Sequence, residues 1–316
     1  MPINLKAILI SVLFLLSTVS YGQQIPVNPV SHRLYSPFIL NPAVAGSKDY
    51  FSTDIIAGFQ GRTYSQLISS NTRISRKIPG YHSSPSSRGF TRIGAGALVF
   101  NDMREDTITS GAGAAFSYHF PLNKESLSFI SAGVTVKGIY HIYKGNEDLN
   151  IPSKEFMYPD LDAGIYYYSP DLYAGLSVTD ILGPPDDPDT INTYVNKASR
   201  RYNLTAGYKI VLSRSLNLIL EPSLIIVTDD SLSFDLKENI QPALRFYAGN
   251  FCLGTYFNDY SKVSFFFQYR YPKFYVGTYF ALPKDSPFFK RSPTAEIAIG
   301  INFSKNNSGY TKNGHW

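Results

Sequence analysis

Residues 158–180 read Tyr-Pro-Asp-Leu-Asp-Ala-Gly-Ile-Tyr-Tyr-Tyr-Ser-Pro-Asp-Leu-Tyr-Ala-Gly-Leu-Ser-Val-Thr-Asp. The stretch contains two runs in which side chains of two kinds alternate, separated by a turn. Successive side chains of a strand point to opposite faces, so each run has one apolar face and one that is polar, small or Tyr. Residues 169–172 are the turn, because Pro170 presets φ and Asp171 can bond its own backbone. Each run has about the ~9–11 residues with which a tilted strand crosses a bilayer. The stretch predicts a β-hairpin.

The two faces of this hairpin have different expected surroundings. An ionised carboxylate in hydrocarbon has no partner, so the face that carries the aspartates should line the lumen of a barrel. The residues expected to face lipid are Leu161, Ala163, Ile165, Ala174, Leu176 and Val178. Those expected to face the lumen are Asp160, Asp162, Tyr166, Gly175 and Ser177. If the lumen holds water, Leu176→Arg should destabilise the protein more than Ser177→Arg, whereas greater damage from Ser177→Arg would mean a reversed register or a lumen packed with side chains.

The composition of the chain suits a membrane barrel. The 316 residues include 24 Tyr and 22 Phe, and 17% are charged, below the ~25% of typical soluble domains. After residue 22 no run reaches the ~20 consecutive apolar residues of a membrane helix. Many aromatic and few charged residues favour a β-barrel with aromatic girdles. A secreted β-sandwich would show a similar composition and a similar alternation.

The alternating pattern repeats almost to the end of the chain. It predicts an all-β fold, a transmembrane antiparallel up-and-down barrel over residues 51–303, with fourteen strands. The predicted strands are 51–60, 64–74, 90–101, 107–120, 127–143, 160–168, 173–180, 201–212, 216–228, 233–247, 251–258, 262–271, 274–282 and 294–303. From the fourth strand onward every second connection is short, the pattern of outer-membrane barrels with short periplasmic turns. Both termini are then expected in the periplasm; the long 75–89 connection does not follow this pattern.

Both ends of the chain lie outside the predicted barrel. Lys6 followed by an apolar run, with small residues near position 22, predicts a signal peptide over 1–22, cleaved before Gln23. Residues 304–316 form a polar tail after Phe303.

The lead-in, residues 23–50, differs from the strands. Its prolines, which cannot donate to a ladder, argue against a central strand. They are Pro26, Pro29, Pro37 and Pro42. Its apolar residues, among them Tyr35 and Phe38, are too many for a free tail. We therefore expect residues 23–47 to form an ordered, non-strand segment, packed against the barrel or plugging its periplasmic mouth.

The polar residues do not assemble an evident catalytic or metal motif. The five His lack ligand spacing, and His119 and His141 are expected to be polar fillers of the lumen. Asp160, Asp162 and Glu221 could do acid–base work or hold a cation, but more often such residues line a wet lumen or pair with arginines such as Arg245 and Arg270. We predict no catalytic, cofactor-binding or metal residues.

Three further features have structural interpretations. The acidic loop 183–189 could bind Ca²⁺, although it lacks the spacing of a calcium loop, and a solvated loop is favoured. Gly94, Gly96, Gly111 and Gly113 lie within alternating runs rather than at a helix start, so they read as small residues packed under neighbours. Cys252 is expected to be an inert small apolar residue.

Several short elements resemble one family. The lead-in carries Pro29, Ser31, Tyr35 and Pro37, and then Asn41, Pro42, Ala43, Val44, Ala45 and Gly46. Later come Pro159, Asp160, Leu161, Asp162, Ala163 and Gly164, and then Arg201-Tyr202 through Gly207-Tyr208. Together these resemble the PorP/SprF family of outer-membrane proteins of the type IX secretion system of Bacteroidetes, over essentially the whole mature chain.

The resemblance implies a non-enzymatic barrel that works with the type IX translocon and the motor-associated periplasmic ring. It also implies a secreted, adhesin-like cell-surface partner with a C-terminal sorting domain, which the barrel helps to export or to anchor; gliding motility follows in some species. Outer-membrane lipid is the other expected partner. Nucleic acid is not expected, because the net charge of +5 is mild and no dense basic patch accompanies it.

Two other functions stay open from the residues alone. A general diffusion channel or small-solute transporter would use the same barrel. An outer-membrane enzyme would need a nucleophile, a base and an orienting group placed together, which the scattered polar residues do not suggest.

Overall fold

A computed structural model gives the architecture of most of the predicted barrel. The residues that it describes are 34–48, 51–60, 63–74, 92–104, 107–123, 127–145, 153–184, 200–229, 239–257, 262–270, 274–283 and 294–303. The predicted signal peptide, the 75–89 connection and the 304–316 tail lie outside them.

The described chain is almost entirely β-strand. Two short 3₁₀ helices, η1 (Pro37–Ile39) and η2 (Pro42–Val44), precede the strands. The strands are β1 (Phe51–Gln60), β2 (Thr63–Ile74), β3 (Ile93–Met103), β4 (Thr107–Asn123), β5 (Ser128–Tyr143), β6 (Lys154–Tyr168), β7 (Leu172–Thr179), β8 (Arg201–Tyr208), β9 (Ile210–Ser213), β10 (Leu218–Asp229), β11 (Ile240–Ala248), β12 (Phe251–Tyr256), β13 (Lys262–Arg270), β14 (Phe274–Pro283) and β15 (Thr294–Phe303). Among the described residues, no helix has the length and apolar character needed to cross a membrane.

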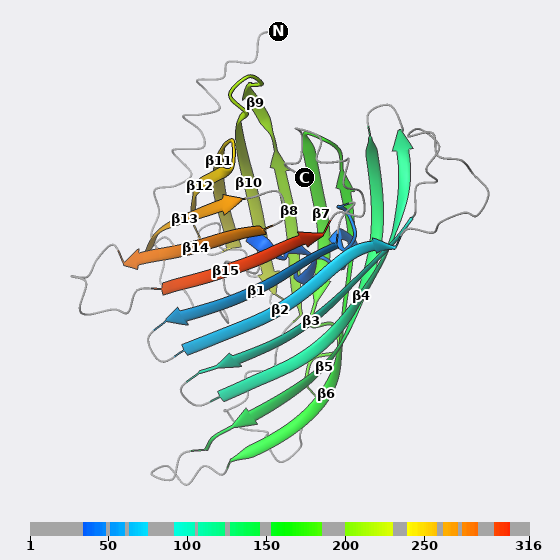
Figure 1. The fold of residues 1–316 in the computed structure, drawn as a ribbon. Coiled ribbons are helices and arrows are strands. Elements are labelled where there is room, and N and C mark those ends of the chain that lie inside the picture. Colours follow the sequence, from blue (N-terminus) through cyan, green and yellow to red (C-terminus); the bar gives the residue numbers. More distant parts are fainter. Residues whose placement is uncertain are drawn as a thin grey trace.

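The strands close into one antiparallel barrel (Figure 1). The first and last strands pair from Phe51 opposite Phe303 to Gln60 opposite Thr294, which closes the sheet. Both β8 and β9 pair with β10, so they are two parts of one strand interrupted at Lys209. The barrel therefore has fourteen strands, and the prediction of a fourteen-stranded antiparallel barrel is confirmed.

The sixth strand is longer than the alternation predicted. It begins at Lys154 rather than at residue 160, and residues 154–158 pair with the end of β5. The longer strand includes Pro159, and a proline lacks the N–H that a central strand needs. Here Pro159 lies opposite Gly138 of β5, while the pairing of β6 with β7 ends at Ala163. Proline is tolerated because on that side β6 has no strand partner among the described residues at this height.

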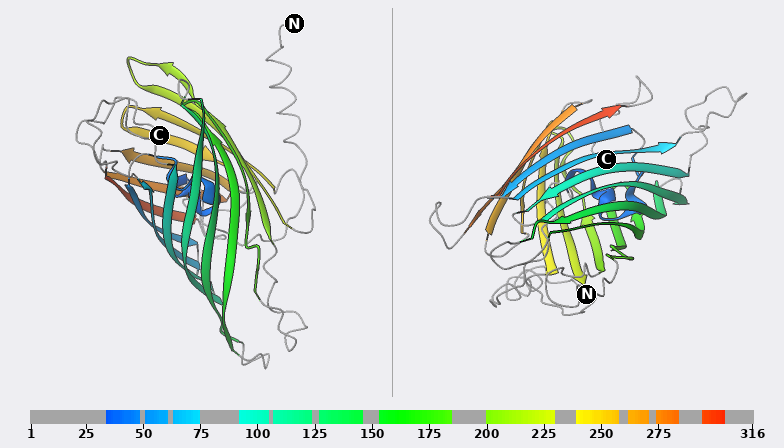
Figure 2. Two further views of the ribbon diagram at one scale, coloured as in Figure 1. Left: turned by 90° about the vertical axis from the view of Figure 1, so that its right-hand side faces the viewer. Right: turned by 90° about the horizontal axis from the view of Figure 1, so that it is seen from below.

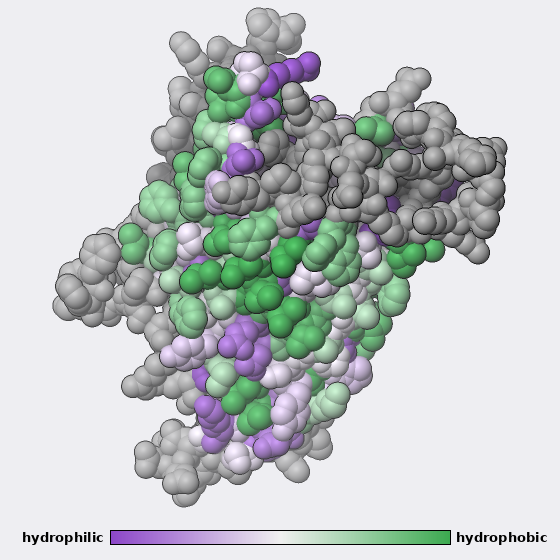
Figure 3. Space-filling model, viewed as in Figure 1, coloured by the Kyte–Doolittle hydropathy of each residue, from purple (hydrophilic) through white to green (hydrophobic). Residues whose placement is uncertain are grey.

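Side chains alternate between the outside of the barrel and its interior. Figure 3 shows an apolar band over the middle of the outer wall, where Ile55, Ile68 and Val99 are about half exposed. The inward positions of the same strands carry small or polar residues such as Asp54 and Ser69, which are buried. In a transmembrane barrel this is the arrangement expected of a wall between lipid and a filled lumen.

Residues 34–48 lie inside the ring of strands. Figure 2 shows this segment, in blue, enclosed by the barrel when the molecule is viewed from below. It is mostly buried and contacts β4, β5 and β6 through η2. We call residues 34–48 the lumen plug.

Candidate functional site: the lumen plug

The plug is two 3₁₀ turns whose sequence favours that shape. Each turn starts with a proline, Pro37 or Pro42, whose fixed φ suits the first helical position. The side chain of Asn41 accepts a hydrogen bond from the backbone N–H of Ala43 at 3.0 Å and so caps η2. Gly46 ends the segment with φ of +69°, a conformation that favours glycine. The Asn41–Gly46 element is thus a compact, self-capped turn.

Glycines of the barrel wall make room for this turn. A Cβ on Gly133 of β5 would lie 2.5 Å from the backbone nitrogen of Ala43, and one on Gly96 of β3 would lie 2.9 Å from the ring of Phe38. Further glycines that a Cβ would bring against the plug are Gly94, Gly164, Gly175 and Gly277. Because real Cβ atoms do not approach so closely, these positions require glycine as long as the plug is in place.

Inward serines bind the carbonyl groups of the plug. Ser177 donates to the Leu40 carbonyl at 2.6 Å, Ser131 to the Ala43 carbonyl at 2.7 Å, and Ser117 to the Ala45 carbonyl at 2.6 Å. The amide of Asn41 in turn donates to the Ile165 carbonyl of β6 at 2.9 Å. Backbone carbonyl groups of an irregular segment are therefore satisfied by β4, β5 and β7, as a buried loop requires, and β6 binds the Asn41 side chain.

The C-terminal end of the plug is held by Arg73 of β2. Its guanidinium donates to the Gly46 carbonyl at 2.7 Å, to the Ser47 carbonyl at 3.1 Å and to the Tyr168 hydroxyl at 2.7 Å. His119, which is fully buried, lies 3.0 Å from the Ala45 carbonyl through Nε2 and 2.9 Å from the Tyr168 hydroxyl through Nδ1. His119 is thus a contact of the plug.

Aromatic packing holds the start of the plug. The ring of Tyr35 stacks on that of Tyr275 of β14 with centroids 5.5 Å apart. The Tyr275 hydroxyl donates to the buried carboxylate of Asp54 on β1, which also accepts from Ser36 at 3.1 Å. Phe38 and Tyr35 belong to one apolar cluster with Ile56, Leu67 and Leu98 of the wall. The plug therefore forms a core inside the barrel.

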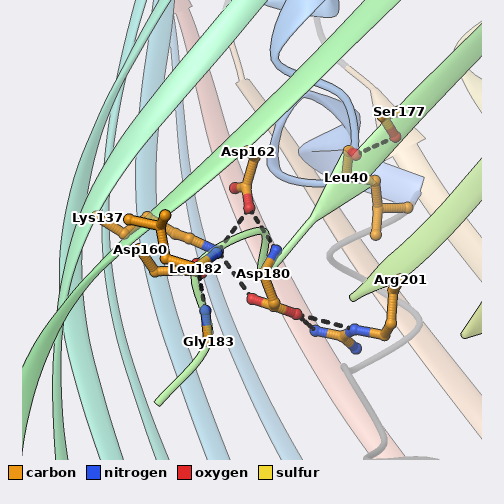
Figure 4. A network of polar contacts seen from close by, with 9 residues as sticks. All are labelled: Leu40, Lys137, Asp160, Asp162, Ser177, Asp180, Leu182, Gly183 and Arg201. Atoms are coloured by element: carbon orange, nitrogen blue, oxygen red, sulfur yellow. Dashed lines mark hydrogen bonds and ion pairs between the residues drawn. The ribbon is translucent and has the colours of Figure 1, made fainter. Parts of the chain in front are cut away.

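A buried ionic cluster lies beside the plug (Figure 4). The ammonium of Lys137 on β5 is 2.8 Å from Asp160, 2.7 Å from Asp162 and 2.9 Å from Asp180. Arg201 of β8 donates to the other oxygen of Asp180 through Nε at 3.0 Å. These three carboxylates are close enough to hold a metal ion, but Lys137 already supplies a positive charge at their centre.

The cluster also holds the backbone that follows β7. Asp162 accepts from the N–H of Asp180 at 3.0 Å, and Asp160 accepts from the N–H of Leu182 at 3.2 Å. Burial opposes ionisation of Asp180, but Arg201 and Lys137 outweigh it, so the pKa of this carboxyl lies below its usual value. Asp180 therefore remains an anion that joins β5, β6 and β8.

A second ion pair joins β10 and β11. Glu221 of β10 is 3.3 Å from Arg245 of β11, the pairing that the sequence suggested. Glu221 also accepts hydrogen bonds from Tyr173 at 2.8 Å and Tyr247 at 3.0 Å. The side chain of Arg270, the other arginine considered, lies outside the described residues.

The structure brings two of the sequence elements that carry the family resemblance, Asn41–Gly46 and Pro159–Gly164, into contact: a Cβ on Gly164 would meet the Asn41 side chain. Pro42, Ala43 and Ala45 are buried within the plug, and Asp160 and Asp162 are in the ionic cluster. On the outer face Ile165 and Leu176 are 50% and 51% exposed, and Leu161 and Val178 are partly exposed. That these four meet lipid stays a prediction.

Sequence analysis missed several residues that hold the plug. Lys137, Arg73, Ser117 and Ser131 were not singled out, because each is a lone polar residue in an alternating run and its partner is far along the chain. The signal that could have found Lys137 is its position in the alternating run, which puts it on the face that lines the lumen. A lysine on that face needs a buried anion. His141 bonds Thr109 at 2.9 Å and Cys252 is buried among apolar residues.

Comparison with protein families places the chain. Residues 23–301 match the family described as "Type IX secretion system membrane protein PorP/SprF", and the chain belongs to that family. It is therefore a type IX secretion system membrane protein with the fold of an outer-membrane β-barrel. The family is described by secretion and not by catalysis. No curated protein sequence matches the chain.

Solved structures that resemble the chain are also barrels of distant sequence. The toluene transporter TbuX of Ralstonia pickettii has 10% identity and a TM-score of 0.43, with 84% of this chain and 92% of that chain covered. The KdgM porin has 9% identity and a TM-score of 0.38, with 81% and 99% covered. BamA from Haemophilus ducreyi lacking POTRA domains 1–3 has 11% identity and a TM-score of 0.37, with 81% and 71% covered. Likenesses this distant carry no argument about activity.

Proposed function

We propose that this protein is a non-enzymatic outer-membrane component of the type IX secretion and gliding machinery that helps to export or anchor one secreted, adhesin-like partner. In this proposal both termini lie in the periplasm, where the secretion ring and motor proteins would reach them. Family membership supports the secretion role. The observation that carries the choice of a scaffold over a channel is the plug, whose backbone carbonyls and Asn41 side chain are bonded to four consecutive strands of the wall.

The manner in which the plug is held supports a permanent filling. A segment that moved aside to admit solute would leave inward glycines and serines facing a void, and the buried Arg73 without its two carbonyl acceptors. Buried polar groups that lose their partners cost about 1–3 kcal/mol each. A rigid, filled barrel instead presents its rims and outer wall as binding surfaces.

The test is a comparison of surface proteins between a strain lacking the gene and the same strain complemented with it. We expect one secreted protein with a C-terminal sorting domain to disappear from the cell surface and to accumulate in the periplasm. Unchanged surface proteins, together with a loss of uptake of small solutes, would contradict the secretion role and favour the transporter.

Conductance separates the same two functions in the purified protein. A filled barrel in a planar bilayer should pass no steady ion current, whereas a general diffusion channel should conduct continuously. A steady current through the unaltered protein would overturn the scaffold interpretation.

A further inference from the structure

The β9–β10 hairpin rises beyond the neighbouring turn of the barrel wall (Figure 1). On the side of β7, the last backbone hydrogen bond of this strand runs from the Lys209 N–H to the Asp171 carbonyl at 2.7 Å. Beyond it, β9 pairs with β10 alone among the described strands. At ~3.4 Å per residue, the four residues of β9 extend the hairpin by about 13 Å past the turn.

The projecting strand is apolar on both faces. Ile210 lies opposite Leu220 on the outer face of the sheet, whereas Val211 lies opposite Ile219 on the face that carries Glu221 in the lumen. Ile210, Val211 and Leu212 are 39%, 49% and 55% exposed. Lipid around the barrel would cover the outer face only, so it does not account for exposed Val211.

An open strand edge with apolar faces is a site for pairing. Its unpaired N–H and C=O groups template another strand, and natural barrels normally remove such edges by closure. Proteins that keep an edge open use it to bind an extended peptide, with backbone bonds giving affinity and alternate side chains giving specificity. Lys209 and the exposed Arg214 flank the edge, so a partner with acidic residues at the ends of its apolar strand matches it in charge.

We infer that the free edge of β9 is a docking site for an extended segment of another protein, with alternating apolar residues and acidic ends, bound by strand addition. The site lies at the end of the barrel where β1 begins at Phe51, β15 ends at Phe303 and the short 169–171 and 249–250 turns lie. The inference depends on the fold alone and goes beyond the proposed function. Whether the edge of β9 binds a peptide can be tested independently of whether the protein exports a partner.

The experiment is amide hydrogen exchange of the full-length protein in lipid nanodiscs. The probe is a short synthetic peptide of alternating valine and threonine with an aspartate at each end. We expect the peptide to slow exchange of the Val211 amide, which points to the free edge because the Lys209 N–H points to the β7 side and alternate amides of a strand point the same way. A second peptide, identical except for N-methyl groups at alternate backbone nitrogens, keeps the side chains but cannot pair, and it should give no protection.

Two substitutions refine the test. Leu212→Lys on the edge strand should weaken binding of the probe about tenfold, which corresponds to ~1.4 kcal/mol. Leu216→Lys in the turn of the same hairpin adds the same charge at a residue that is 65% exposed, and it should leave binding unchanged.

Three outcomes would overturn the inference. Equal protection by both peptides would mean adsorption to an apolar surface and not strand addition. No protection at any concentration at which the peptide is monomeric would mean that the edge does not pair. A Val211 amide that is already protected in the monomeric protein alone would mean that another part of the same chain covers the edge.

Discussion

Between β1 and β7 the plug fills much of the lumen and glycines and serines of the wall lie against it, whereas between β11 and β14 wall side chains fill most of the interior and only Leu34 and Tyr35 of the plug reach it. In the second region the buried cluster consists of wall side chains, with Tyr256, Phe266 and Tyr279 as its largest members. In the first region the wall contributes Gly96, Gly133 and Gly164, and the bulk comes from the plug. A close-packed interior can thus be reached with large wall residues or with small ones and an inserted segment.

The difference teaches how a membrane barrel can specify a plug. Where a segment's backbone enters, the wall must lose its side chains and supply hydrogen-bond donors, since the irregular backbone has carbonyl groups to satisfy. The inward glycines and serines therefore lie where the wall contacts the plug. Four sets of substitutions test this comparison.

Removal of the cation in each ion cluster should have the largest effect. Lys137→Met leaves three buried carboxylates without their shared positive charge and should cost about 3–5 kcal/mol of unfolding free energy. Arg245→Met should cost less, because Glu221 keeps its bonds from Tyr173 and Tyr247. Urea-driven unfolding in lipid vesicles measures both. Adding Asp160→Asn to Lys137→Met should recover part of the lost unfolding free energy. A larger cost for Arg245→Met than for Lys137→Met would contradict the conclusion that the Lys137 cluster depends more on its cation.

The neighbours Leu176 and Ser177 test the two sides of the wall. Leu176→Arg places a charge on the outer face and should cost about 2–4 kcal/mol in vesicles. Ser177→Arg should also destabilise the protein, because Ser177 is buried and bonds the plug at Leu40. The mild effect expected for a water-filled lumen does not apply, because the plug occupies the lumen at this position.

The two arginine variants differ in a second measurement. Ser177→Arg should release the plug and expose the bond after Arg33 to trypsin, with fragments identified by mass spectrometry. Leu176→Arg should leave that bond as resistant as in the unaltered protein. Rapid cleavage there in the unaltered protein, with the barrel intact, would show that the lead-in is not held.

Alanine substitutions at two glycines of β5 distinguish contact with the plug from the general effect of alanine in a strand. Gly133→Ala drives a Cβ into the backbone of the plug and should cost about 1–3 kcal/mol. Gly138→Ala, where the nearest atom is Met157 Cε at 3.6 Å, should be tolerated. Equal unfolding midpoints of the two variants would mean that the plug does not press on β5.

Single hydrogen bonds should give the smallest effects. Asn41→Ala removes the cap of η2 and the bond to the Ile165 carbonyl, and should cost about 1 kcal/mol while increasing trypsin cleavage after Arg33. Tyr256→Phe removes a buried hydrogen bond, to Gln241, from the region between β11 and β14 that wall side chains fill. It should cost a similar amount in urea without any change in cleavage, and a change would show that the two regions are coupled.

The sequence by itself determined the barrel and its strand count. Alternation of side chains is a local property with period two, so runs such as 160–168 and 294–303 could be found without knowledge of any partner. The predicted strand 160–168 was too short, because residues 154–159 join β6 by pairing with the end of β5. The apolar, proline-rich composition of the lead-in predicted an ordered segment packed against the barrel or plugging its periplasmic mouth, but not which strands it contacts.

Only the tertiary structure decided what the inward residues do. Alignment of Asn41 with Gly164, or of Lys137 with Asp180, joins residues far apart in the chain, and depends on the register of each strand pair and on the closure of the sheet. One residue of slip would turn each of these side chains to the other face. The physical reason is that alternation specifies which face a residue occupies, whereas contacts across a lumen depend on the summed geometry of all fourteen strands.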